Sequence, residues 1–232
     1  MNITKSQIIE WEEDGLIISS RYQEKIAADG INSAKSLGER NDKKDFLFYS
    51  KLFEGIHFND NISILDIGCG KGDLLAFINQ YYPETRIDKY LGLDIVASFI
   101  DVAQSNYAQY EFKIQNFVSK EFLPEESFEI VVANGVLISR VRNYRDYIEY
   151  FVEKMLTCSS RHILFNLIGE VDSYSENYIS YKQIGRSTTF PKQVIESILE
   201  KLDDINYNIA EQQIFPDATD MFIRIDNLKA LK

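Results

Sequence analysis

Basic residues are in deficit in this sequence. Its 232 residues include 25 Lys and Arg against 36 Asp and Glu, and the formal net charge is −11. Binding along a nucleic-acid backbone needs clustered Lys and Arg, so this balance disfavours a nucleic-acid partner. The same deficit disfavours an anionic membrane surface. No apolar run approaches the ~18 residues of a membrane-spanning helix, so we expect no membrane segment.

Cysteine, histidine and proline are also rare. The two cysteines, Cys69 and Cys158, cannot build a disulfide framework, which predicts a reduced, cytoplasmic chain. The first residues lack the basic segment and apolar stretch of a signal peptide. The only histidines are His57, before the first predicted strand, and His162, at the amino end of the fifth. We therefore expect neither to act as a general base, and we predict no metal site.

Strands and helices alternate from residue 61 onward. Short apolar runs bounded by turn residues predict strands, and apolar residues at helical spacing predict helices. The predicted strands are Ile62–Ile67, Tyr90–Asp94, Tyr110–Gln115, Phe128–Ala133, His162–Leu167, Ile205–Ile214 and Met221–Ile225. The predicted helices are Ser6–Asp29, Lys43–Glu54, Asp73–Tyr82, Ala97–Tyr107, Val141–Leu156 and Pro191–Leu202. This order predicts an α/β fold with a mostly parallel sheet, helices on both faces and a final hairpin.

The first sixty residues differ from the rest, because they are polar, suit helices and contain no strong strand pattern. We expect residues 1–60 to form a helical cap and residues 61–232 to form the core. Parallel sheets of this kind bind ligands at the carboxyl ends of their strands. The residues that follow the predicted strands are therefore the main candidates for a site.

A glycine-rich segment, Asp66-Ile67-Gly68-Cys69-Gly70-Lys71-Gly72, joins the first strand to the next helix. Its alternating glycines let the backbone turn sharply and approach a ligand closely. A dinucleotide-binding loop would carry glycine at the position of Asp73, and a phosphate-binding P-loop would need Ser or Thr after Lys71. A carboxylate at position 66 would also repel a pyrophosphate. The segment predicts a loop for a ligand that carries positive charge.

Polar residues follow the next three strands as well. Asp94 ends the second strand, where a carboxylate accepts hydrogen bonds from ribose hydroxyls. Gln115, Asn116 and Phe117 lie at the end of the third strand and suit the edge and face of an adenine. The small residues Asn134 and Gly135 follow the fourth strand and leave room for a ligand.

These residues together resemble a known family. Asp66-x-Gly68-x-Gly70-x-Gly72, Asp94 and the segment Phe128–Val136 look like the class I S-adenosylmethionine-dependent methyltransferases, over about Asn61–Ile225. The resemblance implies a three-layer, Rossmann-like, doubly wound sheet of seven strands with a C-terminal antiparallel hairpin. It also implies S-adenosylmethionine as the cofactor and S-adenosylhomocysteine as the product.

The resemblance further implies a role for each matching position. The glycines would line the methionine and ribose of the cofactor, Asp66 would lie near its amino-acid end, and Asp94 would hold the ribose. Asn116 and Phe117 would face the adenine, Asn134 and Gly135 the methyl end, and Arg40 the carboxylate. The implied cofactor-binding residues are Arg40, Asp66, Gly68, Cys69, Gly70, Gly72, Asp94, Ile95, Gln115, Asn116, Phe117, Asn134 and Gly135.

A finer resemblance links the chain to some uncharacterised bacterial members of a small-molecule branch. The shared segments are Gly38-x-Arg40, Tyr90-Leu91-Gly92-Leu93-Asp94, Asn134-Gly135 and Phe165-Asn166-Leu167. Glu39 departs from the pattern, because an aromatic residue is usual there.

The sequence leaves the methyl acceptor open. The short chain and the lack of an added recognition domain favour transfer to an oxygen or nitrogen of a small molecule, and the acidic charge disfavours a nucleic-acid acceptor. A protein acceptor and a non-catalytic cofactor-binding module remain alternatives. The segment Gly169–Thr189 is either a lid or a plain surface excursion. Neither a general base nor an oligomeric state is specified. Further candidates for the pocket are Tyr22, Tyr49, Arg140, Arg142, Asn166, Glu170, Tyr174, Tyr178 and Tyr181.

Overall fold

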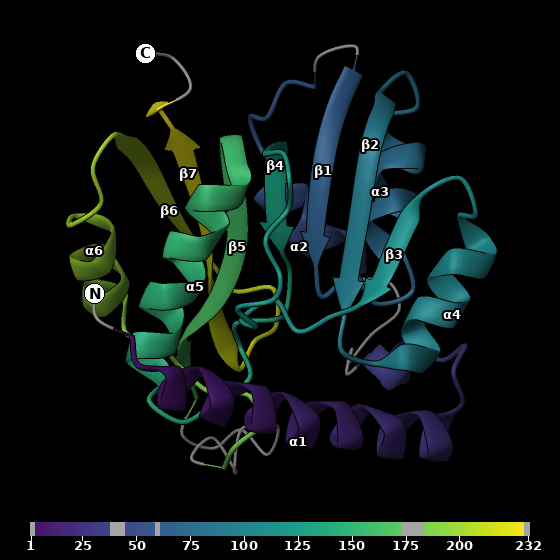
Figure 1. Cartoon of the computed structure of the whole chain (residues 1–232), viewed down its shortest axis with the longest axis horizontal. Helices are drawn as coiled ribbons and strands as arrows, with labels where there is room; N and C mark the ends of the chain where they lie inside the picture. Colours follow the sequence, from purple (N-terminus) through teal and green to yellow (C-terminus); the bar gives the residue numbers. More distant parts are fainter. Residues whose placement is uncertain (1–2, 38–44, 59–60, 173–182, 230–232) are drawn as a thin grey trace.

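A seven-stranded sheet in the order β3-β2-β1-β4-β5-β7-β6 forms the middle of the molecule (Figure 1). The structure is a computed structural model that describes residues 3–37, 45–58, 61–172 and 183–229. The strands are β1 Asn61–Ile67, β2 Arg86–Asp94, β3 Glu111–Ile114, β4 Phe128–Ala133, β5 Ser159–Val171, β6 Ile205–Gln212 and β7 Ala218–Asn227. The helices are α1 Lys5–Asp29, α2 Asp45–Leu52, α3 Asp73–Tyr81, α4 Ala97–Asn106, α5 Tyr144–Cys158 and α6 Lys192–Leu199, with a 3₁₀ turn at Ala34–Leu37.

The central strands are apolar on both faces because helices cover both. Along β1, Ile64 belongs to a cluster with α2, α3 and α4, whereas Leu65 belongs to a cluster with α5 and α6. Alternate residues of a strand point to opposite faces, which explains this division. Strands buried in this way read as continuous apolar runs, as β4 does.

Among the described strands, β7 is the one that runs opposite to the other six. β7 pairs antiparallel with both β5 and β6, whereas β1, β2, β3, β4 and β5 pair parallel to one another. The turn between β6 and β7 joins the two as a hairpin. The predicted seven-stranded, mostly parallel α/β sheet with a C-terminal hairpin is confirmed.

Helix α1 lies across the end of the sheet at which β1 and β2 terminate (Figure 1). It begins after Thr4, whose hydroxyl accepts a hydrogen bond from the backbone N–H of Gln7 at 3.2 Å. A reciprocal bond from the Thr4 backbone N–H to the Gln7 side chain completes a capping box. The helix ends at Gly30, where φ is +82°. None of the described helices is long and apolar enough to cross a membrane.

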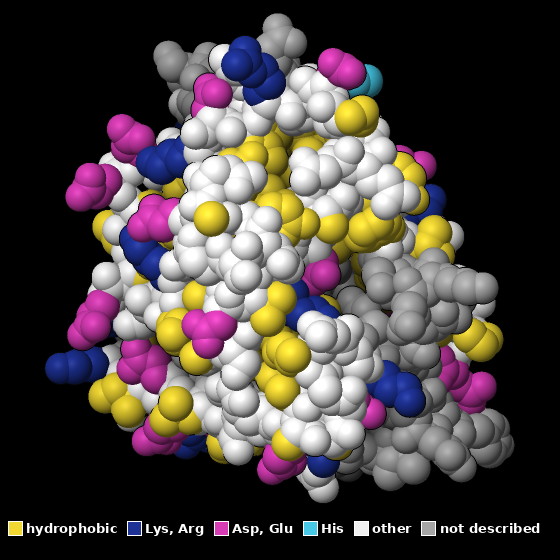
Figure 2. Space-filling model, turned by 90° about the vertical axis from the view of Figure 1, so that its right-hand side faces the viewer, with side chains coloured by type: hydrophobic (Ala, Val, Ile, Leu, Met, Phe, Trp, Pro, Cys, Tyr) yellow, Lys and Arg dark blue, Asp and Glu magenta, His cyan; other side chains and the backbone are white. Residues whose placement is uncertain are grey.

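Charged side chains are interspersed on the molecular surface. On the face shown in Figure 2, Lys and Arg side chains lie among Asp and Glu rather than in one continuous stripe. Apolar side chains are visible between them, whereas Trp11 and Phe53 are among the side chains that are fully buried.

Candidate functional site

A cavity of about 480 Å³ opens at the carboxyl ends of β1, β2 and β4, beneath α1. This volume lies within the ~300–1,000 Å³ of small-molecule sites. The loops after the strands form its floor, and one face of α1 forms its roof. Residues that line it include Trp11, Gly15, Ile18, Arg21, Tyr22, Lys25, Tyr49, Gly68, Cys69, Gly70, Asp94, Ile95, Gln115, Asn116, Phe117, Asn134, Gly135, Val136, Asn166, Arg186 and Asp220.

The glycine loop after β1 needs glycine for both shape and space. Gly68 and Gly70 have φ values of +72° and +54°, in the left-handed region that other residues rarely adopt. A Cβ on Gly68 would lie 2.3 Å from a methyl carbon of Val136. The backbone N–H groups of Gly68 and Cys69 both donate to the Leu93 carbonyl, at 2.7 and 2.9 Å. The loop is therefore fastened to the end of β2, with a bare backbone beside the cavity.

Cys69 lines the cavity but is not a nucleophile. Burial raises the pKa of its thiol well above the usual range, and its side chain is 1% exposed. A protonated, enclosed thiol is unreactive, so Cys69 contributes packing.

Asp94 ties the ends of two neighbouring segments together. One carboxylate oxygen accepts from the Gly70 N–H at 3.0 Å, and the other accepts from the Val96 N–H at 2.8 Å. Burial raises the pKa of Asp94 to about 6, and these backbone donors limit the rise. Each oxygen retains a lone pair for a further donor. Asp94 can therefore hold the loop and accept hydrogen bonds from a ligand at the same time.

The segment after β3 forms one wall of the cavity. The side-chain oxygen of Asn116 accepts a hydrogen bond from the Val118 N–H at 3.2 Å. Phe117 is 3% exposed and packs on Phe151, with ring centroids 4.7 Å apart. Lys154 supports this wall from α5, because its ammonium donates to the Ser119 carbonyl.

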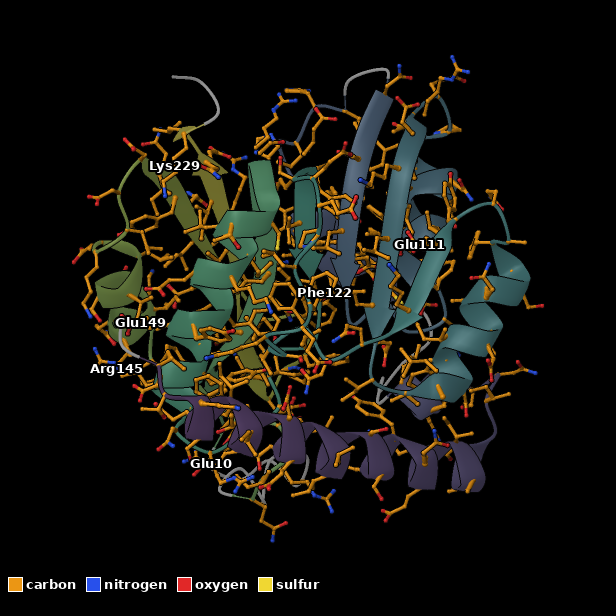
Figure 3. The ribbon with its side chains drawn as sticks, in the orientation of Figure 1. Glu10, Glu111, Phe122, Arg145, Glu149 and Lys229 are labelled. Atoms are coloured by element: carbon orange, nitrogen blue, oxygen red, sulfur yellow. The ribbon has the colours of Figure 1, made fainter. Side chains whose placement is uncertain are left out.

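Two aromatic rings lie close to the ammonium of Lys154. Its ammonium lies 5.2 Å from the ring centre of Phe117 and 5.6 Å from that of Phe122. Figure 3 labels Phe122 beside the central strands. Burial lowers the pKa of Lys154 to about 8. The wall is thus fastened to α5 by one charge-assisted hydrogen bond and two ring contacts.

Asparagine side chains shape the floor after β4. The Asn166 side-chain oxygen accepts from the Gly135 N–H at 2.7 Å and fixes the turn at which Gly135 has φ +73°. The side-chain oxygen of Asn134 is buried and has no hydrogen-bond partner among the described residues. Since a buried acceptor without a partner is costly, this atom is suited to a donor on a ligand.

A cluster of contacts, called here the α1 latch, holds α1 over the cavity. Its residues are Trp11, Asp14, Ser19, Ile95 and Arg142. The Asp14 side chain, 1% exposed, accepts hydrogen bonds from the backbone N–H and the Nε of Arg142, at 2.7 and 2.9 Å. The Trp11 indole donates to the Arg142 carbonyl at 2.8 Å. Further along the helix, the Ser19 hydroxyl donates to the Ile95 carbonyl at 3.1 Å.

A glycine permits the close approach of this helix. A Cβ on Gly15 would lie 2.6 Å from the side-chain nitrogen of Asn116. Glycine inside a helix costs about 1 kcal/mol relative to alanine, so its presence is explained by the contact with the wall after β3.

Several predicted site residues lie elsewhere. Asp66 is not among the residues that line the cavity. Its side chain lies on the face of β1 that α3 covers, where it accepts a 2.6 Å hydrogen bond from the Tyr90 hydroxyl. Alternation along β1 explains this, since Ile64 faces the same way. Gly72 begins α3 at φ +89°, and a Cβ there would meet the Tyr107 ring at 2.7 Å. Gly72 therefore serves packing, and Arg40 lies outside the described residues.

Of the other pocket candidates, some line the cavity and others do not. Tyr22, Tyr49 and Asn166 line the cavity, whereas Arg142 is used by the α1 latch, and Arg140 and Glu170 do not line it. His162 pairs with Asp226 at 2.8 Å at the amino end of β5, and His57 is exposed. Tyr174, Tyr178 and Tyr181 lie outside the described residues, and the structure describes only the two ends of segment 169–189.

Sequence reasoning missed the contribution of α1 to the lining beyond Tyr22. The helix supplies residues at positions 11, 15, 18, 22 and 25, which share one face at helical spacing. That spacing was a usable signal, but it does not reveal which surface the face covers. Val136, Ser139, Tyr147, Phe215 and Asp220 were also missed.

A reversed last strand, a glycine loop after β1 and an acid at the end of β2 define the class I methyltransferase architecture. A family model described as "Methyltransferase domain" matches residues 58–200, which is more than half of the chain. The chain belongs to the class I S-adenosylmethionine-dependent methyltransferase family.

Curated proteins match part of the chain. The chain is 26% identical over 91 residues to a phosphoethanolamine N-methyltransferase of Plasmodium falciparum, a match that covers 38% of this chain and 32% of that protein. The chain spans 24% and 32% of the length of two curated relatives that it matches.

Solved structures extend the likeness over nearly the whole fold. The plantazolicin methyltransferase BpumL, solved with a desmethylplantazolicin analogue and S-adenosylhomocysteine, aligns with a TM-score of 0.62 and 17% identity, over 97% of this chain and 100% of its own. A magnesium protoporphyrin IX methyltransferase of Synechocystis PCC 6803, solved with S-adenosylmethionine, gives 0.59 and 13%, over 92% and 97%. At such identities these structures support the fold.

Proposed function

We propose that this chain transfers a methyl group from S-adenosylmethionine to an oxygen or nitrogen of a small-molecule acceptor. The observation that carries the proposal is the 480 Å³ cavity in which the bare glycine loop, Asp94 and the wall after β3 converge under α1. The family membership supports the reaction class. We also propose that residues 1–60 act as the cap of the site and residues 61–232 as its core.

The residues present fit the cofactor. Gly68 and Gly70 lie at the cavity, and a Cβ at either would press on the side chain of Val136 or Leu37, so only glycine keeps this loop in place with a bare backbone beside the cavity. Asp94 can accept hydrogen bonds from ribose hydroxyls. The buried side-chain oxygen of Asn134, which has no partner among the described residues, can accept one from a donor on the cofactor. Asn116 offers amide donors and Phe117 an apolar contact for a base. These residues, with Cys69, Ile95, Gln115 and Gly135, are the proposed cofactor-binding set.

When bound, S-adenosylmethionine supplies an activated methyl group on a positively charged sulfur. The chain then has to bind the cofactor and the acceptor, orient them toward each other and exclude water. Orientation of the reacting groups alone lowers the barrier by on the order of 7–11 kcal/mol in well-aligned reactions. The roof formed by α1 and the fastened floor loops provide this rigidity. Tyr22, Tyr49 and Tyr147 place aromatic rings around the cavity, and ring faces favour a nearby cation by about 0.5–2 kcal/mol.

A small acceptor fits better than a macromolecule. The cavity has the volume of a small-molecule site, and α1 lies over it (Figure 1). The Plasmodium relative is by its name an enzyme that methylates a nitrogen of a small phosphorylated amine. That likeness supports a nitrogen acceptor as one form of the proposal.

Two measurements test the proposal. Calorimetry with S-adenosylhomocysteine is expected to show binding at a single site. Incubation with methyl-labelled S-adenosylmethionine and a cell extract, followed by size fractionation, is expected to place label in the low-mass fraction. Label confined to protein would favour a protein acceptor, cofactor binding without transfer in any extract would favour a binding module, and no binding would refute the proposal.

A further inference from the structure

Three cationic side chains line the cavity close to one another. Arg21 and Lys25 stand one turn apart on α1, and Arg186 belongs to the segment that follows residue 183. This segment lies beside the helix, because a Cβ on Gly185 would be 3.4 Å from the side chain of Ile18. It is held in place by backbone hydrogen bonds, with the Arg140 N–H donating to the Arg186 carbonyl at 2.9 Å.

None of the three cations has a carboxylate partner among the described residues. The ion pairs between described residues do not include Arg21, Lys25 or Arg186. The Nε of Arg21 is buried and makes no hydrogen bond to any described residue. The contacts present are with a ring: Lys25 lies 5.3 Å and Arg21 5.8 Å from the centre of Tyr22.

Burial and the neighbouring positive charges lower the pKa values of both α1 side chains. Burial lowers the pKa of Arg21 and lowers that of Lys25 to about 8, and repulsion by Arg186 contributes to both shifts. Asp29 opposes the shift at Lys25 but is exposed at the end of α1. A partly buried group of like charges is stabilised by an anion within reach.

The cofactor does not remove this excess. S-adenosylmethionine carries a sulfonium and an ammonium against one carboxylate, so it brings net positive charge into the cavity. Asp73, Asp94 and Asp220 also line the cavity, but the ion pairs among the described residues join none of them to Arg21, Lys25 or Arg186. A further ligand with a negatively charged group would compensate the three cations where they lie.

We propose that the methyl acceptor is an anion whose carboxylate or phosphate group is held by Arg21, Lys25 and Arg186. This inference rests on the proposed methyltransferase function and adds the chemical class of the acceptor. A guanidinium binds either oxyanion through paired hydrogen bonds, and the flexible Lys25 ammonium adds a point charge. The acceptor's nucleophilic atom lies elsewhere in the same molecule or within the carboxylate itself.

The test uses the protein saturated with S-adenosylhomocysteine at constant ionic strength. Acetate and inorganic phosphate are titrated separately, and stronger binding of one of them identifies the class of oxyanion. Arg21→Gln and Arg186→Gln are each expected to weaken binding of that anion by about ten-fold or more, as for loss of a charged hydrogen bond. The matched control is Lys120→Gln, an exposed lysine outside the lining, which is expected to leave binding unchanged.

A second titration separates this idea from the alternative that the cations hold the carboxylate of the cofactor. Methylthioadenosine lacks that carboxylate. If the inference is right, Arg21→Gln changes the affinities for S-adenosylhomocysteine and methylthioadenosine by the same small factor. A loss of about ten-fold or more for S-adenosylhomocysteine alone would assign Arg21 to the cofactor and overturn the inference.

Different results would overturn the anionic acceptor and the proposed methyltransferase function. Wild-type protein that binds S-adenosylhomocysteine normally but binds neither anion, or binds them equally in Arg21→Gln and Lys120→Gln, would overturn the anionic acceptor alone. Wild-type protein that does not bind S-adenosylhomocysteine would overturn the proposed function and the acceptor class with it.

Discussion

Asp94 holds the glycine loop by its backbone: one carboxylate oxygen lies 3.0 Å from the amide nitrogen of Gly70. The residue at the end of β2 thus positions the loop after β1 across a parallel strand pair. Asp94 thus shapes the cavity, and in the proposed cofactor site the same carboxylate would accept hydrogen bonds from the ribose.

Asp94→Ala is expected to weaken S-adenosylhomocysteine binding by about ten-fold or more, because charged hydrogen bonds to ribose and loop are lost together. Calorimetry measures the dissociation constant. Asp101→Ala, which removes an exposed carboxylate from α4, is the control and is expected to bind as wild type does. Equal affinities for the two variants would contradict the role of Asp94.

Gly68→Ala is expected to destabilise the protein by about 1–3 kcal/mol and to weaken cofactor binding. The reason is the clash of its Cβ with Val136 at 2.3 Å, added to the positive φ. Urea unfolding measures the free energy. In the double variant with Val136→Ala, the clash is removed and part of the loss is expected to return, whereas strictly additive effects would show that the two residues do not compete for space.

Arg142→Ala is expected to lower the free energy of unfolding, since it leaves the carboxylate of Asp14 buried and without its cation. Hydrogen exchange in α1 is expected to accelerate as well. The control is Arg145→Ala on α5, an arginine that points away from the core (Figure 3). An α1 that exchanges at the same rate in both variants would show that the latch does not hold the helix.

Asp66→Asn tests a buried acid through the pH dependence of stability. Burial raises the pKa of Asp66 from 3.8 to about 7, although the Tyr90 hydrogen bond opposes the rise. Between these values the folded state binds more protons than the unfolded state, so wild-type stability falls as pH rises through this window. Asparagine does not titrate. The variant is therefore expected to gain about 2 kcal/mol relative to wild type between pH 5 and pH 7.5.

Unfolding in urea at the two pH values gives this difference directly. Asp101→Asn is the matched control, because its carboxylate is exposed. A stability difference between Asp66→Asn and wild type that does not change with pH would mean that Asp66 has the same pKa in the folded and unfolded states.

The sequence predicted the elements well because their signals are local. The strand predicted at Phe128–Ala133 has those bounds in the structure, and the helix predicted at Ser6–Asp29 spans Lys5–Asp29. Other bounds differ: β3 and β6 are shorter than the predicted Tyr110–Gln115 and Ile205–Ile214. In contrast, β5 extends over Ser159–Val171 because β7 pairs with it beyond Leu167. Pairing with a distant strand leaves no local pattern.

The candidate site divides along the same line. Gly68, Gly70 and Asp94 were predicted from their positions after strands, and the structure places them at the cavity. The side chain of Asp66 was expected there too, but the register of β1 turns it to the other face. A single residue at a strand end can face either way, and only the neighbouring layers decide which.

The sequence by itself determined the order of strands and helices, the glycine loop and the acid at the end of β2, since each depends on residues close together in the chain. Only the tertiary structure decided that α1 covers the strand ends, because Asp14 and Arg142 lie 128 residues apart. It also brought Arg21 and Lys25 to Arg186, an arrangement made by packing between segments that share no local pattern.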